Sequence, residues 1–254
     1  MGKLWTILML TVGLTHTAFA AEVFNLAVPE DAYAPYVVMN DRQEVIGGLL
    51  IDPLREALAS LAVELKIHTV PIQRSRLLLE NDQIDGVMHS PDWVENGDQL
   101  LWLDLGVWVE DRLYFKSDTA NPPQNLQQLE NIELITHMGY SYPNLEPLFM
   151  QGKAVRIDQY SGEEMIRALV GAPQGSERFM VMDSKAWQWY QQKTPVHLQL
   201  QANSFFVGCA PLQLRLANNE RMLRLQPLIQ EKIHRYQASD SAVDCPRAQA
   251  LGDD

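Results

Sequence analysis

The sequence has little cysteine, fewer basic than acidic residues, and no long apolar run beyond its first twenty residues. Its 254 residues include 2 cysteines, and 20 Lys and Arg residues stand against 32 Asp and Glu residues. The formal net charge of -12 disfavours binding to nucleic acid or to an anionic membrane surface. A spanning helix needs roughly 18 consecutive apolar residues. We therefore expect a mature chain that neither spans a membrane nor binds nucleic acid.

Familiar catalytic and cofactor motifs are missing as well. None of the 6 histidines forms an i,i+4 pair, and no Cys-x-x-Cys, Walker loop or dinucleotide-binding glycine pattern occurs. Residues Gly139-Tyr140-Ser141-Tyr142-Pro143 resemble the nucleophile elbow of hydrolases, but a proline replaces the final glycine. The sequence thus predicts neither a metal site nor a cofactor, and it disfavours a hydrolase.

The first twenty residues have the layout of a secretory signal peptide. Lys3 precedes the apolar segment Leu4–Leu14, and Ala18-Phe19-Ala20 is a small-x-small cleavage signal. We expect cleavage near Ala20 and a periplasmic location for the mature chain. No cysteine lies at the cleavage point, so no lipid anchor is indicated.

The two cysteines, Cys209 and Cys245, are predicted to form a disulfide in an oxidising compartment. Closing the long loop between them would stabilise the fold by roughly 3–4 kcal/mol. Two free thiols are the alternative. A zinc or catalytic-thiol role is weaker, because neither cysteine has a neighbouring histidine or second cysteine.

Strand and helix patterns alternate along the mature chain. Helical spacing of apolar residues occurs in segments 52–65, 161–170, 184–192 and 219–236, and strand character in 23–28, 66–71, 84–89, 133–137 and 178–182. Asp52 is expected to be the N-cap of the first helix. Segment 100–115 is expected to hold one or two strands, and 196–209 two. The pattern predicts an α/β fold.

A turn-rich break at Asn121–Asn125 divides this pattern into two parts. We expect two α/β lobes joined by a two-strand hinge. The first lobe is discontinuous and comprises residues 21–113 and 205–254, and residues 114–204 form the second. The chain is predicted to be a monomer.

Several motifs occur in a distinctive order. They are Tyr33-x-Pro35-Tyr36, Gly48-x-x-x-Asp52, Arg74 ahead of Ile84-Asp85-Gly86, Gly139-Tyr140-Ser141-Tyr142 and the helical region 214–236. Together they resemble the bacterial extracellular solute-binding proteins of family 3, over most of the mature chain. The resemblance implies two lobes that close around a small ligand. It also implies a membrane partner, either an uptake permease or a sensor receptor.

One departure from this family concerns the ligand. Members that bind amino acids usually have Thr-x-x-Arg after the strand that corresponds to 84–89, and that Arg holds the ligand's α-carboxylate. Here the segment is Ser90-Pro91-Asp92-Trp93, so Trp93 occupies the position of the Arg. An indole carries one donor and no charge. We therefore expect a small polar or aromatic-bearing solute rather than an ordinary α-amino acid.

The candidate ligand-binding residues lie at strand ends, at helix starts and in the motifs of the resemblance. Tyrosine rings offer flat walls, an arginine fork suits a carboxylate, and turn N–H groups hold anions. Some of these residues also have a structural alternative. Helix capping is the alternative for Ser90 and Asp183. Packing is the alternative for His89 and Trp93, and plain solvent exposure is the alternative for Arg74. The full set is Tyr33, Tyr36, Arg74, His89, Ser90, Trp93, Tyr140, Ser141, Tyr142 and Asp183.

We expect binding without chemistry, and two other interpretations stay open. An enzyme on the same scaffold, similar to a dehydratase, would place Asp92 or Asp183 over the ligand. A buried cleft carboxylate with a strongly raised pKa would mark such an enzyme. A diverged sensing or accessory protein is the third interpretation, and Trp93 is the residue that supports it.

Overall fold

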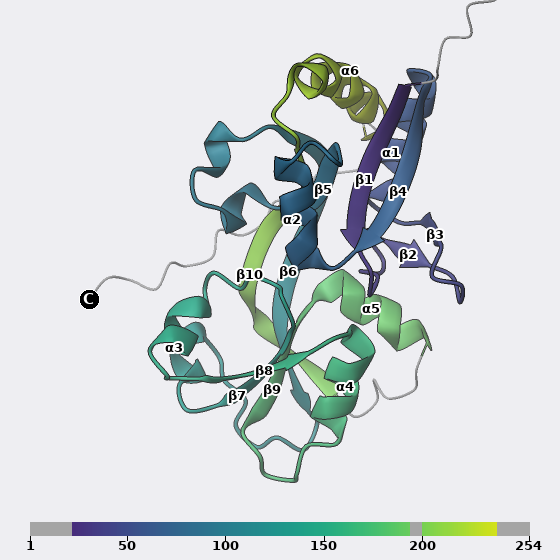
Figure 1. Ribbon diagram of the computed structural model, residues 1–254. Coiled ribbons are helices and arrows are strands. Elements are labelled where there is room, and N and C mark those ends of the chain that lie inside the picture. Colours follow the sequence, from purple (N-terminus) through teal and green to yellow (C-terminus); the bar gives the residue numbers. More distant parts are fainter. Residues whose placement is uncertain (1–21, 194–199, 238–254) are drawn as a thin grey trace, which may run out of the picture.

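The computed structural model describes residues 22–193 and 200–237. The predicted signal peptide and Cys245 lie outside these residues. Within them no helix is both long and apolar enough to cross a membrane. Helices and strands alternate, which confirms the predicted α/β class (Figure 1).

The strands are β1 (Glu22–Pro29), β2 (Val38–Met39), β3 (Val45–Gly47), β4 (Val63–Val70), β5 (Gly86–His89), β6 (Trp102–Lys116), β7 (Glu133–His137), β8 (Val155–Gln159), β9 (Arg178–Asp183) and β10 (Leu200–Leu216). The α-helices are α1 (Ile51–Ser60), α2 (Ile72–Glu80), α3 (Glu146–Met150), α4 (Gly162–Val170), α5 (Ser184–Lys193) and α6 (Glu220–Gln237). Three short 3-10 helices are η1 (Pro91–Trp93), η2 (Gly97–Gln99) and η3 (Leu126–Leu129).

A single sheet runs through the molecule in the order β4-β1-β5-β10-β6-β9-β7-β8. Strands β4, β1 and β5 are parallel at one end, and β9, β7 and β8 are parallel at the other. Between them β6 and β10 pair antiparallel along most of their length. These two strands extend from the upper to the lower half of the molecule (Figure 1) and connect the two halves.

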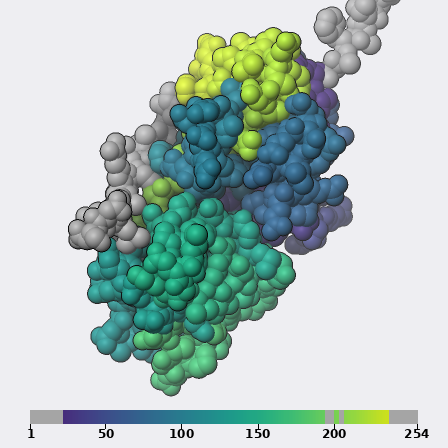
Figure 2. Space-filling model, turned by 60° about the vertical axis from the view of Figure 1, so that its left-hand side comes forward, coloured from purple at the N-terminus to yellow at the C-terminus, as the bar shows by residue number. Residues whose placement is uncertain are grey.

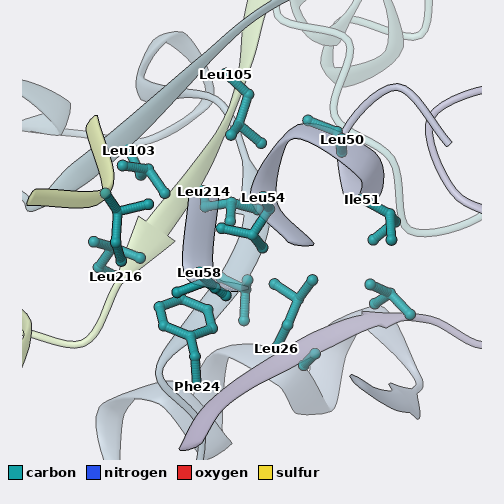
Figure 3. Close-up of a cluster of buried hydrophobic side chains, with 14 of the residues drawn as sticks. Phe24, Leu26, Leu50, Ile51, Leu54, Leu58, Leu103, Leu105, Leu214 and Leu216 are labelled. Atoms are coloured by element: carbon teal, nitrogen blue, oxygen red, sulfur yellow. The ribbon is translucent and has the colours of Figure 1, made fainter. Parts of the chain in front are cut away.

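The upper half has one hydrophobic core. Phe24 and Leu26 of β1 pack with Leu54 and Leu58 of α1, and Leu214 of β10 joins them (Figure 3). All five side chains are at most 1% exposed. Burying side chains of this size stabilises a fold by about 1.5–3 kcal/mol each, so this cluster holds α1 against the sheet.

The lower half has a core on each face of its sheet. Leu134 and Phe179 belong to one cluster, whereas their chain neighbours Ile135 and Met180 belong to the other. Successive strand residues point to opposite faces, and helices or loops cover both. This explains why β7 and β9 are apolar at consecutive positions rather than at alternate ones.

The change from one core to the other falls within the two long strands. Val109 and Ala210 belong to the upper core, whereas Leu113 and Val207 belong to a lower one. The register of β10 against β6 shifts on both sides of Phe206, and such irregularities bend a strand. The molecule is therefore two-lobed, with β6 and β10 as the predicted two-strand hinge. The lobe boundaries at 113/114 and 204/205 remain a prediction.

Some local expectations are wrong. Leu50, not Asp52, is the N-cap of α1, and Asp52 lies in the first turn, where its carboxylate accepts a hydrogen bond from the Gly48 N–H at 3.2 Å. The two strands expected within 196–209 are, from residue 200 onward, parts of the single 17-residue β10. Segment 100–115, in contrast, holds one strand, the 15-residue β6, in agreement with the expectation of one or two. Hydrogen bonding between β6 and β10 along most of their length keeps both strands continuous.

Candidate functional site

The loop after β1 carries two of the predicted aromatic residues. Tyr33 and Tyr36 pack ring against ring, with centroids 4.8 Å apart. Gly48 fixes this loop, because it has φ +134 and any Cβ there would lie 2.2 Å from the Tyr36 carbonyl oxygen. The Leu50 N–H donates to that same oxygen at 3.2 Å. The start of α1 and the aromatic loop are therefore locked together.

Tyr36 connects this loop to the second lobe. Its side chain is fully buried, and its hydroxyl donates to Asp183 Oδ1 at 2.8 Å. Asp183 also accepts hydrogen bonds from the N–H groups of Glu110 and Ala186, each at 2.8 Å. Burial raises the pKa of Asp183, and these donors oppose that rise. The carboxylate is the N-cap of α5 and a fixed link between the lobes near the hinge.

The turn after β7 carries the aromatic residues of the second lobe. The rings of His137 and Tyr140 stack with their centroids 3.9 Å apart. The rings of Tyr33 and Tyr140 meet edge to face, with their centroids 5.2 Å apart. The Tyr142 hydroxyl accepts the His137 backbone N–H at 3.0 Å. By contrast, the Tyr140 hydroxyl oxygen is buried and has no hydrogen-bond partner.

Arg156 of β8 holds this turn in place. Its guanidinium donates to the Tyr140 carbonyl at 3.0 Å and to the His137 carbonyl at 3.4 Å. It also forms ion pairs with Glu146 and Asp158, at 3.1 and 2.9 Å. The charge of Arg156 is thus neutralised by two carboxylates, and its role is to position the turn.

A cavity of about 240 Å³ lies between the lobes at the hinge. The first lobe contributes η1, the hinge contributes β6 and β10, and the second lobe contributes the turn that leads into α3. The Asn144 side chain in that turn donates to the Val207 carbonyl at 2.9 Å, which ties the turn to β10. The lining residues are Asp92, Trp93, Val109, Asp111, Tyr142, Pro143, Asn144, Leu145, Val207, Gly208, Cys209 and Ala210.

A second, smaller cavity of about 30 Å³ adjoins it on the other side of Asp111 and Tyr142, which line both. This cavity is lined from the first lobe by the Tyr33 loop and from the second by the His137–Tyr142 turn, α4, β9 and α5. Its polar lining includes Asp111, Asp183 and the unpartnered Tyr140 hydroxyl. The two cavities therefore form one inter-lobe site around Asp111.

Asp111 lines both cavities, and its carboxylate, like that of Asp92 in the larger cavity, has no partner in the described chain. No hydrogen bond or ion pair involves its carboxylate within residues 22–193 and 200–237. Burial, reinforced by the nearby Asp183, raises the pKa of Asp111 to about 8. Asp111 is half-buried, and a largely desolvated carboxylate without a partner is costly to the fold, so its presence at the hinge points to a functional role.

A hollow of about 900 Å³ lies elsewhere on the described surface. It is formed by loops 116–132 and 173–179 of the second lobe alone, so opening and closing of the lobes would not change it. For metals, the described residues contain no group of three His, Cys, Asp or Glu side chains suited to binding an ion.

The structure brings most of the predicted residues to this site. Tyr33, Trp93, Tyr140, Tyr142 and Asp183 line one or both cavities, and Tyr36 supports them from behind. His89 and Ser90 lie next to Trp93 without lining a cavity. The His89 ring accepts the Ser90 N–H at 2.9 Å, and the buried Ser90 hydroxyl caps η1 by accepting the Asp92 N–H at 3.3 Å. His89 and Ser90 therefore take the alternative roles of packing and helix capping.

Two predicted residues have no place in the site. Arg74 lies on α2 with an exposed side chain and lines neither cavity. It falls inside the helix rather than before it, and its position turns it toward solvent. Ser141 is also exposed, because its neighbours Tyr140 and Tyr142 take the inward positions of the turn. Neither geometry supports ligand binding by these side chains.

Sequence reasoning missed Asp111, His137 and Arg156. The signal for Asp111 was weak, since Asp104, Glu110 and Arg112 also interrupt the mostly apolar and aromatic segment 100–115. Arg156 and His137 gave no such signal, because their partners lie on other elements. Cys209 lies on β10 and lines the larger cavity, whereas Cys245 falls outside the described residues, so the disulfide remains a prediction.

No protein-family model and no curated protein sequence matches the chain. Solved structures, in contrast, are similar to this chain. Arginine-bound, truncated ArgBP from T. maritima has a TM-score of 0.65 at 16% identity, with 84% of this chain and 96% of that chain covered. An ancestral amino-acid-binding protein, a precursor of cyclohexadienyl dehydratase, has a TM-score of 0.66 at 15% identity, covering 85% and 90%. A histidine kinase sensor domain with similarity to periplasmic binding proteins has 0.68 at 12%, covering 85% and 90%.

The chain has the two-lobed periplasmic-binding-protein fold. This confirms, at the level of fold, the resemblance to family 3 that the sequence motifs indicated. In this periplasmic-binding-protein fold the larger cavity is the space between the lobes beside the hinge strands. The two lobes meet along a narrow seam in Figure 2, with the purple, blue and yellow segments above it and the teal and green segments below.

Proposed function

We propose that the chain is a periplasmic solute-binding protein that captures a small solute between its lobes for uptake or sensing and does not transform it. The observation that carries the proposal is the cavity beside the hinge. Its walls come from η1 of one lobe, from the Tyr142–Leu145 turn of the other, and from both hinge strands. A solute in this cavity would touch both lobes only when they are closed.

Contacts between the lobes support a closing motion. Asp31, in the loop after β1, meets His137 at the end of β7, and Tyr33 meets Tyr140. Both contacts lie at the rim of the site and away from the hinge strands. A ligand that bridges the lobes favours the closed state by its differential contacts. Both contacts are formed in the described conformation, as a closed state requires.

Titration of the purified mature protein with small solutes, followed by small-angle X-ray scattering, tests the proposal. The ligand should reduce the radius of gyration and raise the melting temperature, because it binds the folded, closed state; a hundredfold excess over Kd adds about 2.7 kcal/mol of stability. Substituting Trp93→Ala at the cavity wall should weaken both effects, whereas Trp189→Ala on the outer part of α5 should not. Saturable binding with no change in scattering would contradict lobe closure.

The choice between uptake and sensing rests on a membrane partner. Similar structures include the substrate-binding protein of an amino acid ABC transporter and a histidine kinase sensor domain. Crosslinking of the ligand-loaded protein to inner-membrane proteins, followed by mass spectrometry, distinguishes them. Capture of a permease supports uptake, and capture of a receptor kinase supports sensing. N-terminal sequencing of periplasmic material tests cleavage near Ala20 at the same time.

One observation favours an enzyme as the second candidate. Asp111 is a cleft carboxylate whose pKa lies near 8, so at neutral pH it holds a proton that a dehydratase would use to release a hydroxyl group as water. Mass spectrometry of hydroxylated cyclic acids incubated with the protein tests this. A product lighter by one water, formed by the protein and not by Asp111→Asn, would establish the enzyme and contradict simple binding.

A further inference from the structure

We propose that the solute is a small organic cation without a carboxylate, and that its ammonium group binds Asp111 at the hinge. This inference rests on the proposed solute-binding function and names the class of solute. It differs from the expectation for amino-acid-binding relatives, whose ligands carry a carboxylate as well as an ammonium.

The charges around the site favour a cation. The two cavities are bordered by three carboxylates, those of Asp92, Asp111 and Asp183. Neither lining includes a lysine or an arginine. The only basic side chain in either lining is that of His137. Its Nε2 already lies 2.7 Å from Asp31 Oδ2. A ligand carboxylate would therefore enter an acidic site with no free cationic partner, which costs several kcal/mol.

Two arginines next to residues of the site, Arg112 and Arg156, are directed elsewhere. Arg112 follows Asp111 in β6, so its side chain points to the opposite face of the strand. There its guanidinium lies 4.1 Å from the centroid of the Phe206 ring. Arg156 is paired with Glu146 and Asp158. The position where a carboxylate-binding arginine was expected holds Trp93 instead.

Asp111 is suited to bind an ammonium because it borders both cavities and because its carboxylate has no partner in the described chain. The Tyr140 hydroxyl, buried and likewise unpartnered, borders the smaller cavity beside it. An ammonium has three N–H donors and no acceptor. A carboxylate and a phenol oxygen, both free, are complementary to such a group.

Aromatic rings complete the environment for an organic cation. Trp93 and Tyr142 line the larger cavity from opposite lobes. The faces of these rings attract positive charge, by about 0.5–2 kcal/mol per contact when water is excluded. At about 240 Å³ the cavity lies just below the roughly 300 Å³ lower end of small-molecule sites. The ligand is therefore small, with one ammonium at Asp111 and a short apolar or aromatic body.

Matched pairs of amines and amino acids test the proposal on the mature protein without any substitution. The probes are tyramine with tyrosine, cadaverine with lysine, and agmatine with arginine; each pair differs by one carboxylate. Isothermal titration calorimetry measures each Kd. We expect at least one amine to bind, and to bind at least tenfold more tightly than its parent amino acid. An amino acid that binds as tightly as its amine would overturn the inference.

Substitution at Asp111 gives the second arm of the test. Asp111→Asn keeps the size of the side chain and removes its charge, so we expect amine affinity to fall at least a hundredfold. Asp104→Asn is the matched control, because Asp104 is an exposed residue of the same strand and lines neither cavity. Unchanged amine affinity in Asp111→Asn would place the ammonium elsewhere and overturn the inference.

The panel also separates this inference from the proposed function. Succinate and glucose are included as an anionic and a neutral solute. If either binds and closes the lobes while no amine binds, the ammonium site is wrong and solute binding stands. If no amine, amino acid, anion or sugar of the panel binds at millimolar concentration, both proposals fail.

Discussion

Asp31 Oδ2 lies 2.7 Å from His137 Nε2, and this contact joins the loop after β1 in the first lobe to the end of β7 in the second. The two side chains are 25% and 12% exposed, so water screens the pair only in part. The contact involves no hinge residue. Under the proposed opening of the lobes this contact would act as a latch, because it would have to break.

Loss of the latch should favour the open state. Asp31→Ala removes an interaction worth about 1 kcal/mol, which lowers the closed fraction and weakens ligand binding by about fivefold. Small-angle scattering of the ligand-free variant should show a larger radius of gyration than the unsubstituted protein. Glu130→Ala is the control, since Glu130 pairs with Lys153 inside one lobe. Equal radii for all three proteins would show that the pair does not control closure.

The stability of the protein should fall as pH rises toward 8. Burial raises the pKa of Asp111 to about 8, so between pH 4 and pH 8 the folded state holds a proton that the unfolded state releases. The free energy of unfolding then decreases over this range. Asp183 of β9, which borders the smaller cavity beside Asp111, raises the pKa of Asp111 further.

Asp111→Asn should remove part of this loss. A gain of about 2 kcal/mol at pH 8 would raise the melting temperature by about 4–8 °C, with no difference between the proteins at pH 4. Thermal unfolding followed by circular dichroism from pH 4 to pH 9 measures both curves. Parallel curves across the whole range would mean that Asp111 does not titrate in this window.

The same titration should control ligand affinity. An alkylammonium keeps its proton up to about pH 10, whereas Asp111 must lose its proton to accept it. Below pH 8 amine affinity should therefore rise about tenfold per pH unit, and binding at pH 7 should release a proton. Calorimetry in buffers of different ionisation enthalpy detects this proton. Affinity that falls with rising pH would contradict an ionised Asp111 in the complex.

Tyr140 and Tyr142 provide a matched pair of hydroxyl deletions. Tyr140→Phe removes a buried hydroxyl that has no partner, so stability should be unchanged or slightly higher while amine affinity falls about tenfold. Tyr142→Phe leaves the His137 N–H without its acceptor, which should cost about 1–2 kcal/mol of stability. Denaturant unfolding and calorimetry separate the two effects. A destabilised Tyr140→Phe would indicate an internal partner for that hydroxyl.

Arg74 should be dispensable for the site. Its exposed side chain lines neither cavity, so Arg74→Ala should change the stability by less than about 0.5 kcal/mol and leave the Kd of every solute unchanged. This reverses the sequence-based expectation that Arg74 anchors the ligand. Calorimetry of the variant with the best-bound solute decides between them. A large loss of affinity would restore Arg74 to the site.

Several features could be predicted because their causes are local. Asp183 caps α5 by accepting the Ala186 N–H at 2.8 Å, the alternative role that its position before a helical segment indicated. The aromatic positions near residues 33 and 140 were likewise identified from strand ends. Periodicity and capping depend on residues within a few positions of one another, so a single sequence contains them.

The amino-acid sequence by itself determined the α/β class, the order of its elements and the aromatic loops beside the strands. Only the tertiary structure decided which polar residues share the site. It placed Asp111 between the lobes, turned Arg74 outward and matched Arg156 with two carboxylates. Those outcomes depend on pairing between β6 and β10 and on contacts between lobes, and residues so far apart in the chain carry no mutual spacing from which such contacts can be inferred.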